Sequence, residues 1–169
     1  MDRPSGQQSK IEIRHAFRTG DAGRLIELHG LLYSREYGFD HTFEAYVTKP
    51  LSEFMLTQTP RERIWLVDSD AILMGSVAIV KHSETEAQLR WFLLHPSLRG
   101  SGLGTRLMAE AVEFCREGGY QNVFLWTVSS LLAAAQVYHK AGFRLTEEHA
   151  QELWGSSLTE QRYDLVLHT

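Results

Sequence analysis

Hydrophobic residues in the first third of the chain follow a strand pattern and then a helical one. Residues 11–14 alternate apolar with polar, which predicts a half-buried strand. Apolar residues then recur at helical spacing from Leu25 to Tyr33, so we expect a helix that begins after a turn at 19–21 and ends at Gly38. A second helical pattern covers residues 42–54, and Pro50 within it predicts a kink or a break.

The period of the pattern changes at residue 63. Short apolar runs at 64–67, 71–80 and 86–94 are separated by polar turns. Runs of this length that are bounded by turn residues are typical of strands. We therefore expect three strands of an antiparallel meander.

Helices and strands alternate after Pro96. Residues 102–117 have an amphipathic helical pattern with Cys115 on the apolar stripe, and residues 123–128 form an apolar strand run. Ser130 is expected to cap an alanine-rich helix over 131–140. The remaining expected elements are a strand that starts at 143–145, a polar loop or hairpin arm at 147–161 and a last strand at 163–167.

The composition fits one soluble globular domain. The chain has 169 residues, 43% of them hydrophobic, which suffices for one core and not for two ordinary domains. Residues 1–10 are polar and predict a disordered leader before a single domain over 11–169. No apolar run approaches the roughly 20 residues of a membrane span, and no signal-peptide core is present. We expect a cytoplasmic protein without a membrane partner.

The net charge argues against nucleic-acid binding, and the Cys and His pattern argues against a metal site. Lys and Arg number 17 against 21 Asp and Glu, so the formal net charge is −4. A mildly acidic chain with no basic block is a poor nucleic-acid binder. The single cysteine, Cys115, forms no internal disulfide. The eight histidines show no paired spacing, so we expect no metal site.

The stretch from Leu89 to Arg106 joins a buried strand, a proline, a glycine-rich turn and a helix start. Glycines allow positive φ and a close approach of a ligand to the backbone. Amides gathered at the positive end of a helix dipole bind anions, which predicts a phosphate or pyrophosphate site. The residues expected to form it are Arg99, Gly100, Ser101, Gly102, Leu103, Gly104 and Thr105.

The glycine spacing does not match either of two better-known phosphate-binding loops. A mononucleotide P-loop requires Lys and then Ser or Thr after its last glycine, whereas Thr105 and Arg106 follow here. A dinucleotide fingerprint requires a glycine at 105 or at 107, where the chain has Thr105 and Leu107. Taken alone, the segment could also be a glycine-rich helix start without a ligand.

A second motif accompanies this loop. The pattern R-x-x-G-x-G at 99–104, after a strand and a proline, resembles the acetyl-CoA loop of the GNAT superfamily of N-acetyltransferases. The pattern A-x-x-x-Y-x-x-x-G-F at 134–143 resembles the second signature of that superfamily. Segments 35–38, 89–104 and 125–134 are most similar to acetyltransferase domains fused to MarR-type regulators. The resemblance covers almost all of residues 11–168.

This resemblance implies an α+β, three-layer GNAT-like fold. It has a mixed, mostly antiparallel sheet with helices on both faces, and its fourth and fifth strands, here 86–94 and 123–128, splay apart around the pantetheine arm of acetyl-CoA. Backbone groups of the fourth strand would pair with that arm as another strand would. The cofactor-binding residues implied beyond the loop are Phe92, Leu93, Leu94, Ser130, Ala134 and Tyr138.

The resemblance also implies the chemistry: transfer of an acetyl group from acetyl-CoA to a primary amine, by direct attack in a ternary complex. Tyr138 is implied as the general acid, and a packed core aromatic is the alternative reading of that residue. The fourth-strand positions where many family members carry an acid hold Gln88 and Arg90. Glu36 is our candidate base. Other candidates for that role are Glu86 and His41.

Two other functions stay open at this point. Gln88, together with Leu131 where the family often has asparagine, is compatible with a non-catalytic acyl-CoA-binding module. The second open function is that of a regulatory interaction domain that binds a protein partner. A homodimer is an expectation from the family, and the amine acceptor is not disclosed. We expect Trp154 to line a substrate pocket or a dimer contact, and Trp126 to lie in the core.

Overall fold

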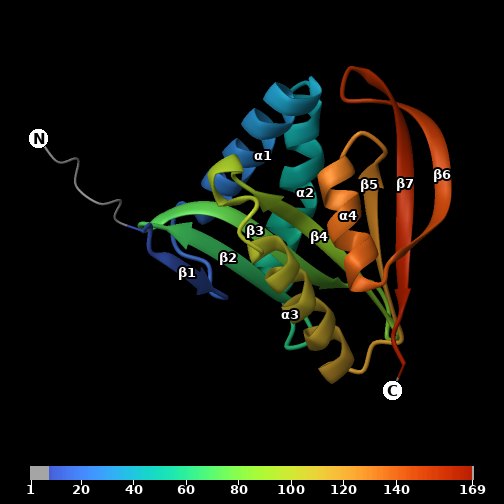
Figure 1. Ribbon diagram of the computed structural model, residues 1–169. Coiled ribbons are helices and arrows are strands. Elements are labelled where there is room, and N and C mark those ends of the chain that lie inside the picture. The colour runs from blue at the N-terminus through green and yellow to red at the C-terminus, as the bar shows by residue number, and fades with distance from the viewer. Residues whose placement is uncertain (1–7, 169) are drawn as a thin grey trace, which may run out of the picture.

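We describe residues 8–168 of a computed structural model of the chain (Figure 1). Most of the leader predicted at 1–10 lies outside these residues. The Lys10 amide donates to the Asp70 carboxylate, and the Asp70 amide donates to the Lys10 carbonyl. No helix in the described part is long and apolar enough to cross a membrane. The elements are β1 Ile11–Arg14, α1 Asp21–Tyr37, α2 Thr42–Thr57, β2 Arg63–Ser69, β3 Ile72–Lys81, β4 Glu86–Leu94, the 3-10 turn Pro96–Leu98, α3 Leu103–Glu117, β5 Asn122–Val128, α4 Leu132–Ala141, β6 Arg144–Leu153 and β7 Ser156–Val166.

One seven-stranded sheet organises the fold, in the order β1-β2-β3-β4-β5-β7-β6. Every neighbouring pair is antiparallel except β4 and β5, which run parallel. These two strands pair over only three positions, from Glu86 opposite Asn122 to Gln88 opposite Phe124, and then part. The predicted α+β fold with diverging fourth and fifth strands is confirmed.

Helices cover both faces of the sheet (Figure 1). Because side chains alternate along a strand, β2 serves two cores. Trp65 and Val67 pack in the core that includes the apolar stripe of α3, among them Leu107 and the buried Cys115. Ile64 lies in a second core with residues of α1 and α2. The three layers predicted from the sequence are therefore present.

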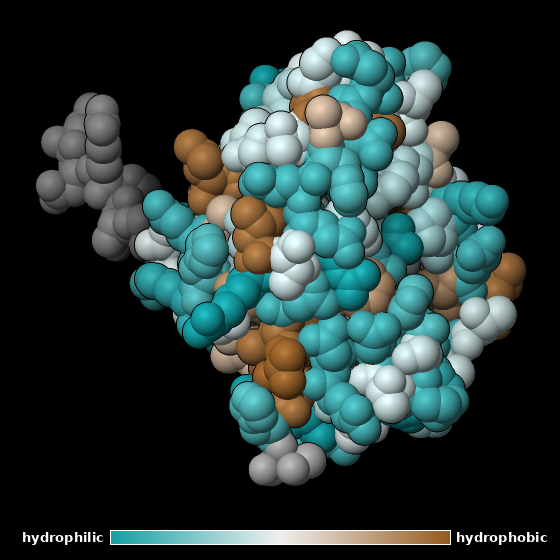
Figure 2. All heavy atoms as spheres, turned by 90° about the vertical axis from the view of Figure 1, so that its right-hand side faces the viewer, coloured by the Kyte–Doolittle hydropathy of each residue, from teal (hydrophilic) through white to brown (hydrophobic). Residues whose placement is uncertain are grey.

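The polar segment predicted as a loop or hairpin arm is a long hairpin, β6 and β7, which makes the last strand much longer than expected. Nearly every residue of β6 is exposed. Figure 2 shows that this side of the molecule is mainly hydrophilic. Exposure on an edge strand removes the apolar alternation on which strand prediction relies, so the sequence alone could not show its length.

The structure decides two predicted helix features: the break at Pro50 is absent, and the cap at Ser130 is wrong. Helix α2 continues through Pro50 without a break, because the buried side chains of Val47, Leu51 and Phe54 hold both halves against the core. Ser130 does not cap α4: the residue before the helix is Leu131, and no side chain bonds to the helix start. Leu131 is buried in the second core, so packing fixes this end of the helix.

Candidate active site

The glycine turn presents a row of unpaired backbone amides. Gly100 and Gly102 have φ angles of 78° and 83°, the left-handed conformation that glycine adopts without strain. Within the described chain, no backbone amide from Gly100 to Thr105 donates to a protein acceptor, and α3 begins at Leu103. These donors stand at the positive end of a 15-residue helix. The turn therefore has the geometry of an anion site.

Gly104 differs from the other two glycines. Its φ is not positive, and it lies in the first turn of α3. A Cβ at this position would lie 3.4 Å from the Phe92 ring and 3.5 Å from the Leu94 side chain. These are ordinary van der Waals distances, so Gly104 places the start of α3 against the end of β4 without a steric requirement for glycine.

A groove of about 490 Å³, here called the cofactor groove, lies beside this turn. Its walls come from the end of β4, the glycine turn, α4 and the end of α1. Ten predicted site residues line it: Glu36, Phe92, Leu93, Leu94, Arg99, Gly100, Gly102, Gly104, Thr105 and Ala134. Ser101 and Leu103 belong to the turn and the helix start without lining the groove, and Ser130 lines neither this groove nor the second cavity below.

Strand β4 is irregular where it reaches the groove. Trp91 has a φ angle of 50°, and the register with β3 shifts between Ser76 and Ala78. The hydroxyl of Ser76 donates a 2.6 Å hydrogen bond to the Trp91 carbonyl, which holds this bulge. Bulges re-aim side chains, and here the strand continues into Phe92, which lines both cavities.

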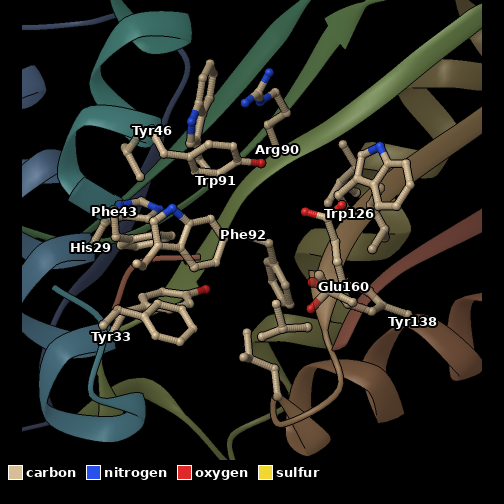
Figure 3. A pocket seen from close by; sticks show the side chains of 18 residues that line it. His29, Tyr33, Phe43, Tyr46, Arg90, Trp91, Phe92, Trp126, Tyr138 and Glu160 are labelled. Carbon is tan, nitrogen blue, oxygen red and sulfur yellow. The ribbon is translucent and has the colours of Figure 1, made fainter. Parts of the chain in front are cut away.

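The second cavity, here called the inner pocket, adjoins the groove through Tyr33, Phe92 and Leu131, which line both. Figure 3 shows Tyr33, Phe43 and Tyr46 of α1 and α2 on one side, and Trp126, Glu160 and Tyr138 on the other. The main lining residues are His29, Tyr33, Phe43, Tyr46, Arg90, Phe92, Trp126, Tyr138, Trp154 and Glu160.

Tyr138 lies in the wall of the inner pocket. Its side chain is 95% buried, and its ring centre is 6.0 Å from that of Phe92, which also lines the cofactor groove. Burial raises the pKa of the Tyr138 hydroxyl well above its usual value. Tyr138 therefore keeps its proton over the whole physiological range and can serve there as a proton donor, but not as a base.

Glu36 and Arg99 form an ion pair in the groove. The guanidinium donates a 2.7 Å hydrogen bond to the Glu36 carboxylate, and Arg99 Nε donates to the Leu94 carbonyl at 2.9 Å. Helix α1 is thus tied to the residue that opens the glycine turn. Glu36 does not line the inner pocket.

Sequence reasoning missed several pocket residues. Trp126 is half-buried in the pocket wall rather than in the core, and Glu160 stands opposite Val128 on the paired strand β7. His29 is buried, and burial lowers its pKa to about 4 although the Leu25 carbonyl accepts a bond from its ring at 2.7 Å. The imidazole is therefore neutral. No local motif marks these residues, because strand pairing and helix packing bring them together.

The remaining sequence predictions concern Trp154 and metal binding. The sequence predicts that Trp154 lines a substrate pocket or a dimer contact, and in the structure it lines the inner pocket. Among the described residues, no group of three or more His, Cys, Asp and Glu side chains is arranged to hold a metal ion. Cys115 is buried, and burial raises its pKa to about 12.

Comparison with known proteins agrees with this architecture. The family model described as Acetyltransferase (GNAT) family matches residues 25–143. An uncharacterized N-acetyltransferase of Schizosaccharomyces pombe is 30% identical over 120 residues, 69% of this chain and 73% of the relative. The uncharacterized N-acetyltransferase YjgM of Escherichia coli is 32% identical over 117 residues, 65% of this chain and 69% of the relative.

Solved structures share the fold at lower identity. An acetyltransferase from Streptococcus agalactiae has a TM-score of 0.77 at 18% identity, covering 93% of this chain and 98% of that one. YncA of Salmonella typhimurium, solved with its cofactor acetyl-CoA, has a TM-score of 0.74 at 17% identity, covering 94% of both chains. The fold is that of acyl-CoA N-acyltransferases, and the chain belongs to the GNAT family of acetyltransferases.

Proposed function

We propose that this protein transfers an acetyl group from acetyl-CoA to a primary amine in a ternary complex. The observation that carries the proposal is the row of unpaired amides from Gly100 to Thr105 beside a groove that adjoins the inner pocket. These amides fit the diphosphate of coenzyme A, because they are donors without acceptors at a helix N-terminus. A Cβ at Gly102 would meet nothing within 4 Å, so the turn is open to a guest.

In this proposal the cofactor groove binds acetyl-CoA and the inner pocket binds the amine. Acetyl-CoA supplies an activated acetyl thioester. The parted end of β4, from Phe92 to Leu94, offers backbone groups for the pantetheine arm and for the carbonyl oxygen that gains negative charge. Tyr138 donates a proton to the leaving thiolate, a contribution of roughly 10²–10⁴ in rate. The aromatic inner pocket holds the amine away from water.

Glu36 as the general base remains a prediction, and the geometry does not favour it. Its carboxylate is engaged by the Arg99 guanidinium and lies in the groove rather than in the inner pocket. Glu160 does line the inner pocket, on the side that carries Tyr138 in Figure 3. We therefore place Glu160 at the amine and give Glu36 the role of positioning Arg99.

The test is an acceptor screen with acetyl-CoA and a library of amines, read by mass spectrometry for the addition of one acetyl group and by release of free thiol. Transfer to an amine supports the proposal. Thermal stabilisation by acetyl-CoA without transfer to any amine would identify a non-catalytic acyl-CoA-binding module instead. Absence of both binding and transfer would favour a regulatory interaction domain. The similarity to MarR-fused domains, the cytoplasmic location and a homodimer remain predictions.

A further inference from the structure

The inner pocket contains two charged side chains from different strands. Arg90 of β4 and Glu160 of β7 both line it. Neither forms an ion pair with another residue between positions 8 and 168. The Arg90 guanidinium lies instead 5.9 Å from the ring centre of Tyr46 and 5.4 Å from that of Trp91. Tyr46 and the more distant Glu53 carboxylate are the groups that act on Arg90 within the protein. Partly desolvated charges outside an ion pair are costly, so both Arg90 and Glu160 are available to a ligand.

The two charges act on a common part of the pocket. Burial raises the pKa of the Tyr46 hydroxyl, while Arg90 acts to lower it and Glu160 to raise it. Tyr46 is therefore within electrostatic reach of both groups. In Figure 3, Arg90 and Tyr46 lie at one end of the pocket, and Glu160 lies in the wall that also carries Trp126 and Tyr138. Both charges therefore face the same pocket, from strands β4 and β7.

Two buried polar groups of the inner pocket lack hydrogen-bond partners among the described residues, and one of them, the Trp91 indole, neighbours Arg90 in the sequence. The indole N–H of Trp91 and the hydroxyl of Thr127 are buried and have no hydrogen-bond partner in the described structure. Both residues line the inner pocket, and Trp91 follows Arg90 directly in β4. An indole and a guanidinium can only donate hydrogen bonds. Neighbouring donors that lack acceptors favour a guest with acidic oxygens near Arg90.

Aromatic rings form the wall of α1 and α2. Tyr33 and Phe43 have ring centres 4.7 Å apart, and Trp154 from the hairpin tip lies 4.9 Å from Phe43. These rings offer an apolar surface to the part of a guest that carries neither the amine nor the acid.

We infer that the acceptor is an amine that also carries a carboxylate: an amino acid, or a close analogue, with an apolar or aromatic side group. This inference rests on the acetyltransferase function proposed above. Arg90 binds the carboxylate, and Glu160 binds the amine. In the transfer the nitrogen–carbon bond forms and the carbon–sulfur bond breaks. The proton that the nitrogen loses goes to Glu160, and the thiolate takes one from Tyr138.

The experiment compares matched pairs of acceptors. Each apolar or aromatic amino acid, such as L-phenylalanine, is tested against the amine that lacks only its carboxylate, such as phenethylamine. We expect kcat/KM to be at least about tenfold higher for the amino acid, the usual size of a charge-assisted bond. The Arg90→Gln variant should lose this preference, and Arg90→Lys should keep part of it. Arg63→Gln, at an exposed arginine of β2, is the control.

Acetyl-CoA affinity is measured separately by calorimetry, and it should be unchanged in all three variants. Competitive inhibition by 3-phenylpropanoate, weakened in Arg90→Gln, gives a second readout. The inference is overturned if the decarboxylated amines react equally well, if Arg90→Gln keeps the preference, or if acetyl transfer occurs only to amines without an acid group. Absence of acetyl-CoA binding to the unaltered protein would instead overturn the proposed function itself.

Discussion

The backbone amide of Asp40 donates a 2.9 Å hydrogen bond to the carbonyl of Trp154. This bond joins the loop between α1 and α2 to the tip of the β6–β7 hairpin, and it holds the Trp154 ring against Phe39 and Phe43, with both ring-centre distances 4.9 Å. The hairpin, which is exposed along most of its length, therefore supplies one wall of the inner pocket through its tip.

Gly155→Ala should loosen this wall. Gly155 has a φ angle of 79°, and a Cβ there would lie 2.9 Å from the Asp40 carboxylate. A left-handed L-residue costs about 1–2 kcal/mol, so we expect the acceptor KM to rise roughly tenfold. Steady-state kinetics at saturating acetyl-CoA measures this. Gly119→Ala, with a φ angle of 78° and no atom within 4 Å of the added Cβ, is the strain-matched control and should leave KM unchanged.

Glu36→Gln separates a positioning role from a catalytic one. If Glu36 only orients Arg99, kcat at saturating substrates should change by less than about threefold, whereas loss of a general base lowers it by about 10²-fold or more. Glu160→Gln should show the large loss. The comparison uses kcat and its pH profile for both variants. A large loss of kcat in Glu36→Gln, without one in Glu160→Gln, would identify Glu36 as the general base.

The location of Tyr138 gives a prediction for the alkaline side of the pH profile. Burial raises the pKa of Tyr138, and the protonated phenol is the active form, so activity should not fall through its ionisation below about pH 10. Tyr138→Phe should lower kcat by about 10²-fold at every pH and leave acetyl-CoA affinity nearly intact. Tyr120→Phe, at a buried tyrosine outside both cavities, controls for packing. A descending limb below about pH 10 that disappears in Tyr138→Phe would contradict the raised pKa, and an unchanged kcat in this variant would contradict the role as the acid.

Arg14 carries a buried ion network whose loss should appear in stability rather than activity. Its guanidinium binds both carboxylate oxygens of Asp21 at 3.0 Å and those of Asp68 at 2.7 and 3.0 Å. Asp21→Asn should lower the free energy of unfolding by about 2 kcal/mol at pH 7, because one partner of the buried guanidinium is lost. Urea denaturation measures this, and Glu12→Gln at an exposed position of β1 is the control.

The pH dependence of the same comparison is a further check. Burial acts to raise the pKa of Asp21, but hydrogen bonds from Arg14 and the Arg18 amide outweigh it, so the pKa is lowered in the folded protein. Its stabilising effect is therefore complete above the unfolded-state value near 4 and is lost as the pH falls through the lower folded value. The stability difference between the unaltered protein and Asp21→Asn should narrow below about pH 4. A difference that is constant with pH would contradict the ionic origin.

The sequence predicts the cofactor groove better than the inner pocket, for a physical reason. The glycine turn is made by contiguous residues whose backbone conformation Gly100 and Gly102 dictate locally. The inner pocket requires Arg90 and Glu160, which meet only after β4 parts from β5 and β7 pairs with β5. Local patterns also failed at Ser130, where burial of the next residue rather than a capping hydroxyl fixes the start of α4.

Isothermal titration of acetyl-CoA into the unaltered protein and into Gly102→Asp tests the central claim most directly. Gly102→Asp places a carboxylate among the amides that we assign to the diphosphate, and Gly119→Asp places one at an equivalent left-handed glycine outside the groove. We predict saturable binding to the unaltered protein and to Gly119→Asp, with none detectable for Gly102→Asp while both variants keep cooperative unfolding. Equal affinity in all three proteins would contradict the assignment of the glycine turn to coenzyme A.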